Sequence, residues 1–369
     1  MSIAFTFPGQ GSQAVGMGRD LADAYAEARA VFDEVDEALA QRLSRLIFEG
    51  PEDELTLTAN AQPALMAVSL AAIRVLEARG LVLRDRVAYV AGHSLGERLS
   101  HIIWEGPQEE LTLTANAQPA LMAVSLAAIR VLEARGLSLK DKVAFVAGHS
   151  LGEYSALAAA GAFSVADTAR LLRIRGNAMQ AAVPVGEGAM AAIIGLEQEE
   201  VEAACAEAAT GSVCQIANDN GGGQLVISGA LPAVEHAARI CTEKGAKRAL
   251  MLPVSAPFHS ALMQPAADAM REALANVASN APIVPVVANV TVSPLTDPDE
   301  IAKRLVEQVT GRVRWRETVE WFAANGVTTL YEIGAGKVLS GLARRIDRNL
   351  ATANIGSPAE VDAALAALL

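Results

Sequence analysis

The run Gly148-His149-Ser150-Leu151-Gly152 has the residue types and spacing of a nucleophilic serine at a sharp strand-to-helix turn. An apolar, strand-like run precedes it and a helix-like run follows it. Such a turn leaves no room for side chains two positions before and after the serine. The hydroxyl then lies at a helix N-terminus, where the helix dipole and the Leu151 N–H stabilise an oxyanion. We predict that Ser150 is a nucleophile; the simpler alternative is an ordinary Gly-Ser turn.

A nucleophilic serine needs a general base, and His259 is the best candidate among the five histidines. We expect it at the end of a strand and just before a helix, where open α/β sheets build their sites. His93 and His149 each precede a serine and are expected to point away from it. His101 follows a repeat junction, and His236 falls in the middle of a solvated helix. His259 is therefore predicted to be the base.

No obvious carboxylate completes a catalytic triad. An α/β-hydrolase places an acidic residue between the serine and the histidine in chain order. Several carboxylates lie between Ser150 and His259, but most fall on predicted helical faces. This lack counts slightly against hydrolase chemistry.

The chain contains a tandem duplication: residues 42–97 and 98–153 are copies of one segment and differ at nine of 56 positions. Two copies are too few for a solenoid. The first copy repeats the serine motif at Ser94, but only the second copy continues into the helix that the turn requires. We therefore expect Ser150 to react and Ser94 to be inactive. Any 56-residue window that starts between positions 42 and 98 could be the surplus, and its apolar strand 87–91 is an aggregation risk.

Alternating strands and helices predict an α/β fold, with a mostly parallel sheet covered on both faces. The order β-α-β-β-α-β over residues 189–254 is that of a ferredoxin-like domain. We predict a large α/β-hydrolase-like domain, residues 1–185 and 257–369, with an inserted ferredoxin-like domain, residues 186–256. The expected strands are 3–7, 87–91 or 143–147, 189–195, 213–217, 224–228, 248–254, 284–290 and 329–333. The expected helices are 22–40, 64–78 or 120–134, 154–160, 165–175, 198–209, 231–244, 261–274, 299–309, 317–324 and 338–347.

Composition argues against several classes of protein. Hydrophobic residues make up 52%, which indicates a packed core, and the net charge of −12 argues against a general nucleic-acid binder. No apolar run approaches the roughly 18 residues of a membrane span, and no charge precedes Arg19, unlike a signal peptide. Cys205, Cys214 and Cys241 include no CxxC pair. We expect a cytoplasmic protein without disulfides, a metal site or a membrane partner.

Six motifs in chain order resemble those of the malonyl-CoA:acyl carrier protein transacylases of type II fatty-acid synthesis. They are Phe7–Gln13, Gly148–Ser155, Arg175-Gly176, Asn218–Asn220, Phe258–Met263 and Glu332–Leu339. The resemblance spans the whole chain except for one repeat copy. Six motifs in this order are specific together, whereas the serine motif alone is not.

The resemblance implies a role for each matching residue. Ser150 would attack the malonyl thioester and His259 would take its proton, with the histidine oriented by neutral partners instead of an acid. The backbone N–H groups of Gln10 and Leu151 would form an oxyanion hole. Arg175 would hold the malonyl carboxylate, because a guanidinium can bind it through two parallel hydrogen bonds. Without the resemblance, Arg175 is better explained as a surface residue of a helix.

Three more residues are implied in substrate binding. Gln308 matches a glutamine near the site, and Asn220 is expected to line the cleft from the small domain. Phe258 looks like the bulky residue that malonyl-selective acyltransferases carry beside the histidine. It would crowd a 2-methyl group, so methylmalonyl is expected to be the poorer substrate.

The resemblance implies a ping-pong transferase that moves malonyl from malonyl-CoA to Ser150 and then to the phosphopantetheine thiol of acyl carrier protein. No cofactor or metal is implied, and we expect a monomer unless the duplication causes swapping. Basic stretches at 239–248, 303–316 and 337–348 are candidates for contact with CoA phosphates or the acidic carrier, and equally for solvated helix faces. Two alternatives stay open: a serine thioesterase or esterase, and a non-catalytic variant disabled by the duplication.

Overall fold

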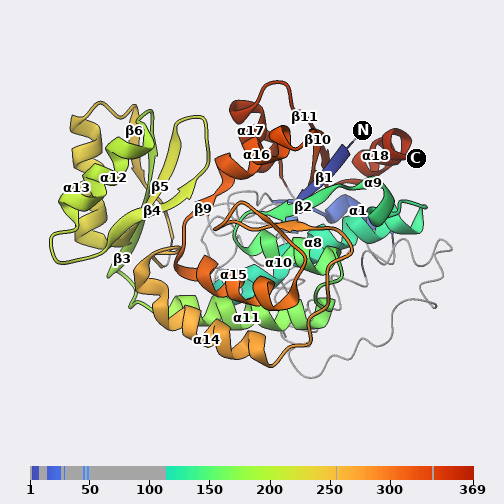
Figure 1. Ribbon diagram of the computed structural model, residues 1–369, viewed down its shortest axis with the longest axis horizontal. Coiled ribbons are helices and arrows are strands. Elements are labelled where there is room, and N and C mark those ends of the chain that lie inside the picture. Colours follow the sequence, from blue (N-terminus) through green and yellow to red (C-terminus); the bar gives the residue numbers. More distant parts are fainter. Residues whose placement is uncertain are drawn as a thin grey trace.

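The computed structural model describes residues 2–7, 15–25, 29, 45, 48–49, 114–254, 256–334 and 336–369. Within them, a six-stranded sheet has the order β11-β10-β1-β2-β7-β8 (Figure 1). Its strands are β1 Ser2–Phe7, β2 Phe145–Gly148, β7 Val286–Val287, β8 Pro294–Leu295, β10 Val327–Ile333 and β11 Ala351–Ile355. All neighbours run parallel except β7 and β8. The predicted α/β fold with a mostly parallel sheet is confirmed.

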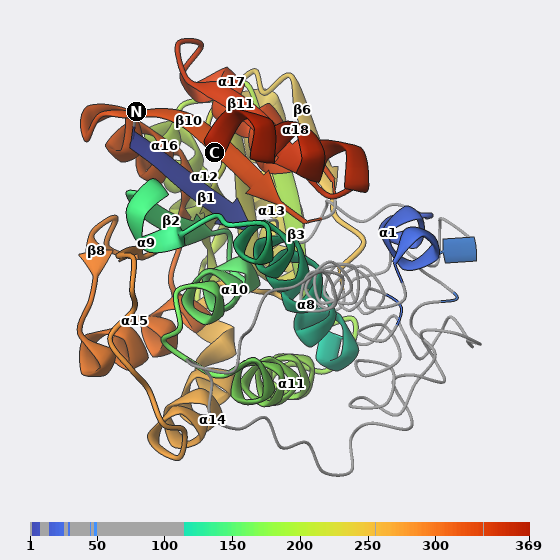
Figure 2. The ribbon, with the colours of Figure 1, turned by 90° about the vertical axis from the view of Figure 1, so that its right-hand side faces the viewer.

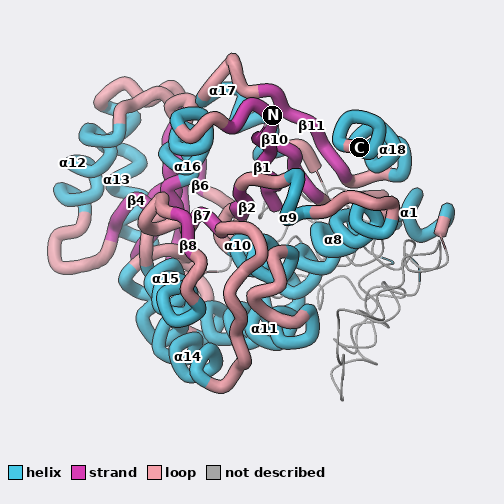
Figure 3. Tube along the Cα trace, turned by 45° about the vertical axis from the view of Figure 1, so that its right-hand side comes forward, coloured by secondary structure: helices cyan, strands magenta, loops and turns pink. Residues whose placement is uncertain are grey.

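Helices cover both faces of this sheet, as predicted. Figure 3 shows α16 and α17 on one side of the strands and α8 and α18 on the other. The covering helices are α8 Thr114–Ala134, α10 Leu151–Ala159, α16 Trp315–Ala324, α17 Val338–Ile346 and α18 Pro358–Leu368. Side chains of β10 alternate between the two cores: Tyr331 and Ile333 pack on the side of α8 and α10, and Leu330 packs on the side of α16 and α17.

A helical layer extends the core beyond the sheet. Helix α11 (Val165–Ala181) packs against α8 and α14 (Gln264–Ala275), and α14 packs against α15 (Pro298–Thr310). Figure 2 shows this layer on the side of α10 that faces away from the strands. The layer brings Arg175, in the second half of α11, and Gln308, near the end of α15, to Ser150 just after β2.

A second sheet holds the β-α-β-β-α-β unit that the sequence predicts. Its elements are β3 Gly188–Ile194, α12 Gln198–Ala208, β4 Cys214–Asp219, β5 Gln224–Ala230, α13 Leu231–Glu243 and β6 Arg248–Met251. The four strands pair antiparallel in the order β6-β3-β5-β4 and have a separate apolar core with both helices. The element order is therefore confirmed, and the unit forms the left part of Figure 1.

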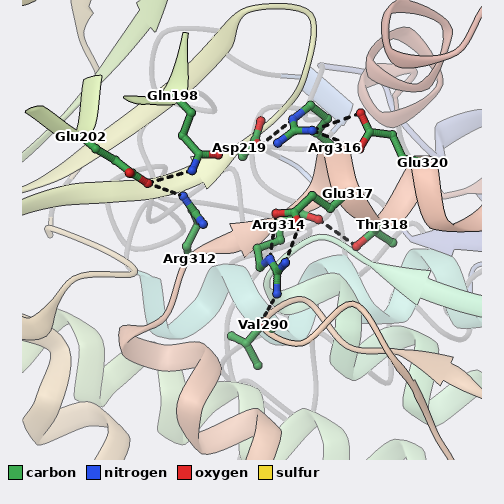
Figure 4. A network of polar contacts seen from close by, with 10 residues as sticks. All are labelled: Gln198, Glu202, Asp219, Val290, Arg312, Arg314, Arg316, Glu317, Thr318 and Glu320. Carbon is green, nitrogen blue, oxygen red and sulfur yellow. Dashed lines mark hydrogen bonds and ion pairs between the residues drawn. The ribbon is translucent and has the colours of Figure 1, made fainter. Parts of the chain in front are cut away.

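The two sheets are joined by a strand that the sequence did not indicate. Strand β9 (Val313–Arg314) comes from the chain after α15 and pairs parallel with β4. Beside it, Arg312 pairs with Glu202 on α12, and Arg316 pairs with Asp219 at the end of β4 (Figure 4). The small sheet is thus fixed to the rest of the molecule by a strand outside residues 186–256.

Several expected boundaries are wrong for local reasons. Helix α8 begins at Thr114, not at 120, and holds Pro119 in its interior. Pro119 is the sixth residue, beyond the first turn, so its missing N–H removes a hydrogen bond that an ordinary helix residue would make. The expected strand 284–290 is reduced to β7, because Asn289 turns away and its N–H bonds to Glu153.

Elements near the ends were missed or fall outside the description. Strand β11 and helix α18 were not expected, although Ser357 and Pro358 are a local helix-start signal that the structure uses: the Ser357 side chain accepts from the Glu360 N–H. Two short helices, α9 Leu139–Lys142 and the 3₁₀ turn Ala261–Met263, complete the described elements after residue 113. Of the expected helix 22–40, the description covers α1 (Arg19–Ala24) and little more. Nearly all of the first repeat copy also lies outside the described residues.

Candidate active site

The turn at Ser150 has the geometry that its sequence motif predicts. Strand β2 ends at Gly148 and α10 starts at Leu151, and Ser150 between them has φ 54° and ψ −112°. This conformation is unfavourable for any residue with a side chain. A Cβ at Gly148 would lie 2.0 Å from the carbonyl of Gly152, so glycine is required there. Ser150 thus sits at the start of α10, where its side chain meets the positive end of the helix dipole.

His259 lies directly against this serine. Ser150 Oγ and His259 Nε2 are 2.7 Å apart, and His259 Nδ1 donates to the backbone carbonyl of Gln308 at 2.8 Å. That carbonyl accepts only, so Nδ1 carries the proton and Nε2 is free to accept one from the serine. The orienting group is neutral, as the resemblance implies.

The expectation that His259 ends a strand is wrong. Strand β6 ends at Met251, and His259 lies in a turn with φ 56°. Pro253 and Pro257 lie between them and cannot donate to a sheet ladder, so the strand stops early. The histidine is placed by this turn and by its bond to Gln308.

The site keeps the His259 imidazole neutral. Burial and, second, the nearby Arg175 guanidinium together lower the pKa of His259 from its ordinary value of 6.5 to about 3. Its side chain is 3% exposed. At neutral pH the ring is therefore a base that can accept the Ser150 proton.

Arg175 is a buried residue of the site and not a surface residue of α11, so the alternative explanation is wrong. Its side chain is 1% exposed. The guanidinium donates to three neutral groups: Gln118 Oε1 at 2.6 Å, Ser150 Oγ at 3.1 Å and Gln308 Oε1 at 3.0 Å. Its Nε is buried without a hydrogen-bond partner among the described residues. A buried cation with these partners still has donors for an incoming anion.

A cavity of about 380 Å³ opens onto this pair. Its lining combines apolar side chains of β3, β5, the segment after β6 and α17 with a few polar groups. The predicted residues that line it are Ser150, Leu151, Arg175, Asn220, Phe258 and His259. Asn220 reaches it from the small sheet and its Oδ1 lies 3.0 Å from His149 Nε2. Such a lining is typical of a small-molecule site.

Gln308 has a different place from the other predicted binding residues. It does not line the cavity but is fully buried behind Ser150 and His259. Its carbonyl orients His259, and its side chain bonds to Ser150 O, Glu153 and Arg175. Gln10 and Ser94, by contrast, lie outside the described residues.

Three residues of the site were missed by sequence reasoning: Gln118, Glu153 and Asn289. Gln118 stands in the Asn-Ala-Gln-Pro run and Glu153 follows the serine motif directly, so both had a local signal. Asn289 had none, because its side chain reaches Ser150 from 139 residues away. Gln118, Ser150 and Glu153 all belong to the second repeat copy, which is the copy that we expected to be active.

No group of His, Cys, Asp or Glu side chains in the described part of the chain is arranged to hold a metal ion. Among the described helices none has the length and apolar character to cross a membrane.

The model of the acyl transferase domain family matches residues 4–99 and 98–349. The chain belongs to the acyl transferase family. The two matches meet where the repeat copies join, at residues 97 and 98. The chain is 42% identical over 363 residues to the malonyl CoA-acyl carrier protein transacylase of Escherichia coli strain K12, which covers 98% of each protein.

Solved structures of this family agree with the fold. The acyl-carrier-protein-S-malonyltransferase of Bartonella henselae superposes with a TM-score of 0.81 at 55% identity, over 100% of this chain and 99% of that one. A malonyl-transacylase in complex with its type II PKS acyl-carrier protein superposes with a TM-score of 0.80 at 38% identity, over 100% of both chains.

Proposed function

We propose that this acyl transferase moves a malonyl group from malonyl-CoA to the phosphopantetheine thiol of acyl carrier protein, and so supplies fatty-acid elongation. The observation that carries the proposal is the Arg175 guanidinium, which is buried and lies 3.1 Å from Ser150 Oγ. A fixed cation beside the nucleophile favours an acyl group that ends in a carboxylate. The transacylases among its relatives support the same substrate.

The reaction proceeds in two half-reactions, acylation of Ser150 and transfer of the acyl group to the carrier thiol. His259 Nε2 takes the Ser150 proton while Oγ attacks the thioester carbon, and the oxyanion is stabilised by the Leu151 N–H and, by resemblance, that of Gln10. The tetrahedral intermediate collapses, the C–S bond breaks, and CoA leaves as a thiol with the proton from His259. The phosphopantetheine thiol then gives its proton to His259 and attacks the seryl ester carbon. The C–Oγ bond breaks, and His259 returns the proton to Oγ, which restores the Ser150 hydroxyl. Phe258, in the cavity wall, disfavours a 2-methyl group.

Transfer is favoured over hydrolysis by two features of the site. The orienting partner of His259 is a backbone carbonyl, whereas an α/β-hydrolase uses an acid. Arg175 has no evident use for a general esterase. The non-catalytic alternative is disfavoured by the 2.7 Å separation of Ser150 and His259. A long-lived malonyl-enzyme in the absence of carrier protein supports the transferase, and rapid release of malonate supports the esterase.

The carrier protein is proposed as the acidic partner of basic side chains near the cavity. The stretch 303–316 is a weaker candidate than the others, because each of its five basic side chains pairs with a carboxylate. In the stretch 239–248, Lys244, Lys247 and Arg248 are exposed. Arg345, in the stretch 337–348, lines the cavity itself. Arg345 can therefore meet a phosphate or carboxylate at the cavity, and the exposed residues of 239–248 offer a basic surface to an acidic carrier.

We further propose a classification for each of the two domains. The antiparallel order β6-β3-β5-β4 supports a ferredoxin-like domain at residues 186–256, and the helix-covered parallel sheet with its serine turn supports an α/β-hydrolase-like domain at 1–185 and 257–369. A cytoplasmic monomer without a cofactor is part of the proposal.

The test is to map the malonyl adduct by mass spectrometry after mixing the protein with malonyl-CoA. We expect one malonyl group on Ser150, none in Ser150→Ala and full labelling in Ser94→Ala, which is the matched control from the other repeat copy. Labelling that is lost in Ser94→Ala and kept in Ser150→Ala would reverse the choice of copy. No adduct in any variant would contradict the proposed function.

A further inference from the structure

A buried polar cluster lies beneath the Ser150 turn, on the side away from the cavity. It consists of Glu153 on α10, Asn289 after β7 and Gln308 on α15, all at most 1% exposed. Neither Glu153 nor Asn289 lines the cavity, so neither contacts a substrate there. Their hydrogen bonds show which parts of the site they fix in place.

Asn289 brackets the backbone on both sides of the nucleophile. Its Oδ1 accepts from the Ser150 N–H at 2.7 Å, and its Nδ2 donates to the Gly148 carbonyl at 2.7 Å. The serine between these two bonds has a positive φ, a strained conformation that persists only where neighbouring groups enforce it. The asparagine amide supplies that enforcement.

Glu153 connects Asn289 with Gln308, the residue that orients His259. Its Oε2 accepts from the Asn289 N–H at 3.1 Å and from Gln308 Nε2 at 2.8 Å. The same Gln308 amide donates to the Ser150 carbonyl at 2.9 Å, and the Gln308 backbone carbonyl accepts from His259 at 2.8 Å. One carboxylate therefore connects the turn of the nucleophile with the support of the imidazole.

Stability alone does not account for this carboxylate. Glu153 Oε1 is buried without a hydrogen-bond partner among the described residues, and burial raises the pKa of Glu153 to about 7. A half-satisfied buried acid is costly, and an apolar or neutral side chain of similar size would fold as well or better. Glu153 instead provides one acceptor oxygen for two donors, and each donor belongs to a residue that also bonds to Ser150 or His259.

We propose that Glu153 and Asn289 are positioning residues for acyl transfer. From the side away from the cavity, they keep Ser150 Oγ and His259 Nε2 correctly placed relative to each other. The proposal rests on the proposed function only in taking Ser150 as the nucleophile and His259 as the base. It needs no assumption about which acyl group is transferred.

The molecule contains a matched control. Glu332 and Asn354 form a second carboxylate–amide cluster at the ends of β10 and β11, where Asn354 Nδ2 bonds to Glu332 Oε2 at 3.1 Å and to the Gly336 carbonyl at 3.2 Å. Asn354 bonds to neither Ser150 nor His259. Asn354→Ala therefore removes the same amide group from a cluster that contacts neither reacting residue.

The experiment compares Asn289→Ala, Glu153→Ala and Asn354→Ala in three measurements. These are kcat and KM for malonyl transfer, the rate at which an uncharged fluorophosphonate modifies Ser150, and the thermal midpoint. We expect kcat to fall on the order of 10²-fold in the first two variants, with KM changed less than about threefold, because a misplaced nucleophile slows chemistry more than binding. Fluorophosphonate modification should slow in parallel, whereas Asn354→Ala should lower only the thermal midpoint.

Conservative variants keep the test decisive if an alanine variant does not fold. Glu153→Gln retains an acceptor oxygen for both donors and should recover kcat to within about tenfold of the wild type. Asn289→Asp retains the acceptor for the Ser150 N–H but loses the donor to Gly148, so it should stay slow. Equal effects of the Asn289 and Asn354 variants on both rates, or a normal rate in Asn289→Asp, would overturn the proposal. If the wild-type protein transfers no malonyl group but reacts normally with the fluorophosphonate, the proposed function is contradicted. The fluorophosphonate rates of the variants would still test the positioning role.

Discussion

Two polar networks of this molecule hold parts of the chain together in different ways. Around Ser150, the side chains are almost fully buried and are connected mainly by hydrogen bonds between neutral groups. At the joint between the sheets, the arginines before, in and after β9 use ion pairs with carboxylates (Figure 4); Glu202 and Glu317 are partly exposed, and Asp219 is buried. Arg312 and Glu202 have side chains that are 27% and 50% exposed.

The difference follows from the access of water. In a buried site each hydrogen bond is made in a low dielectric and fixes geometry closely, and an unpaired charge such as that of Arg175 keeps its strength for a substrate. At the surface, water and salt screen the ion pairs, which then contribute little stability each. Changes in the first network should thus affect chemistry, and changes in the second should affect the joint weakly.

Arg175→Ala should have the largest effect. Loss of the buried guanidinium leaves the malonyl carboxylate without its partner, so kcat/KM with malonyl-CoA should fall about 10²- to 10³-fold. Transfer from acetyl-CoA, which has no carboxylate, should fall far less. Steady-state rates with both donors measure the difference, and an equal loss on the two would refute the carboxylate contact.

The pH dependence of the same site comes next in size. His259 has a pKa of about 3, below its ordinary value of 6.5, so the base stays deprotonated as the pH falls. With acetyl-CoA, kcat/KM should therefore fall from pH 7 to pH 5 by less than the more than about tenfold that an ordinary histidine would lose, although Glu153, with a pKa of about 7, becomes protonated in the same range. In Arg175→Ala the cation that depresses this pKa is gone, so the acid limb should move to higher pH. A wild-type limb near 6.5 would contradict the burial argument.

Sequence reasoning reached one part of the site and missed another for physical reasons. Ser150 stands in a contiguous motif, where local geometry limits the residue types, whereas Arg175 was reached only through the family resemblance. Asn289 and the strand β9 act through contacts between segments more than 90 residues apart, which no local pattern records. The β-α-β-β-α-β order could be predicted because each element has its own apolar period, but the place of His259 in a turn depends on packing around Gln308.

At the joint, Arg316→Ala should have a moderate effect. Its partner Asp219 is 3% exposed, and Asp219 Oδ1 also accepts from the Gly221 N–H at 3.2 Å. Removal of the arginine leaves a buried carboxylate short of one partner, at a cost of about 1–3 kcal/mol in the free energy of unfolding. Because Asp219 precedes Asn220, malonyl transfer should also slow a few-fold. Urea unfolding and steady-state rates check the two effects, and an unchanged unfolding midpoint would mean that water replaces the arginine.

Arg312→Ala should have the smallest effect, although it also breaks an ion pair of the joint. Both partners are partly exposed, and such pairs contribute about 0–1 kcal/mol. The parallel pairing of β9 with β4 stays intact without this side chain, so the cavity should keep its shape. We expect a shift below about 0.5 kcal/mol in urea unfolding, which disappears in high salt because the pair is then screened in the wild type as well. If Arg312→Ala lowers the free energy of unfolding as much as Arg316→Ala does, the exposure of a pair does not determine its contribution. The ion pairs of the joint would then act as one network.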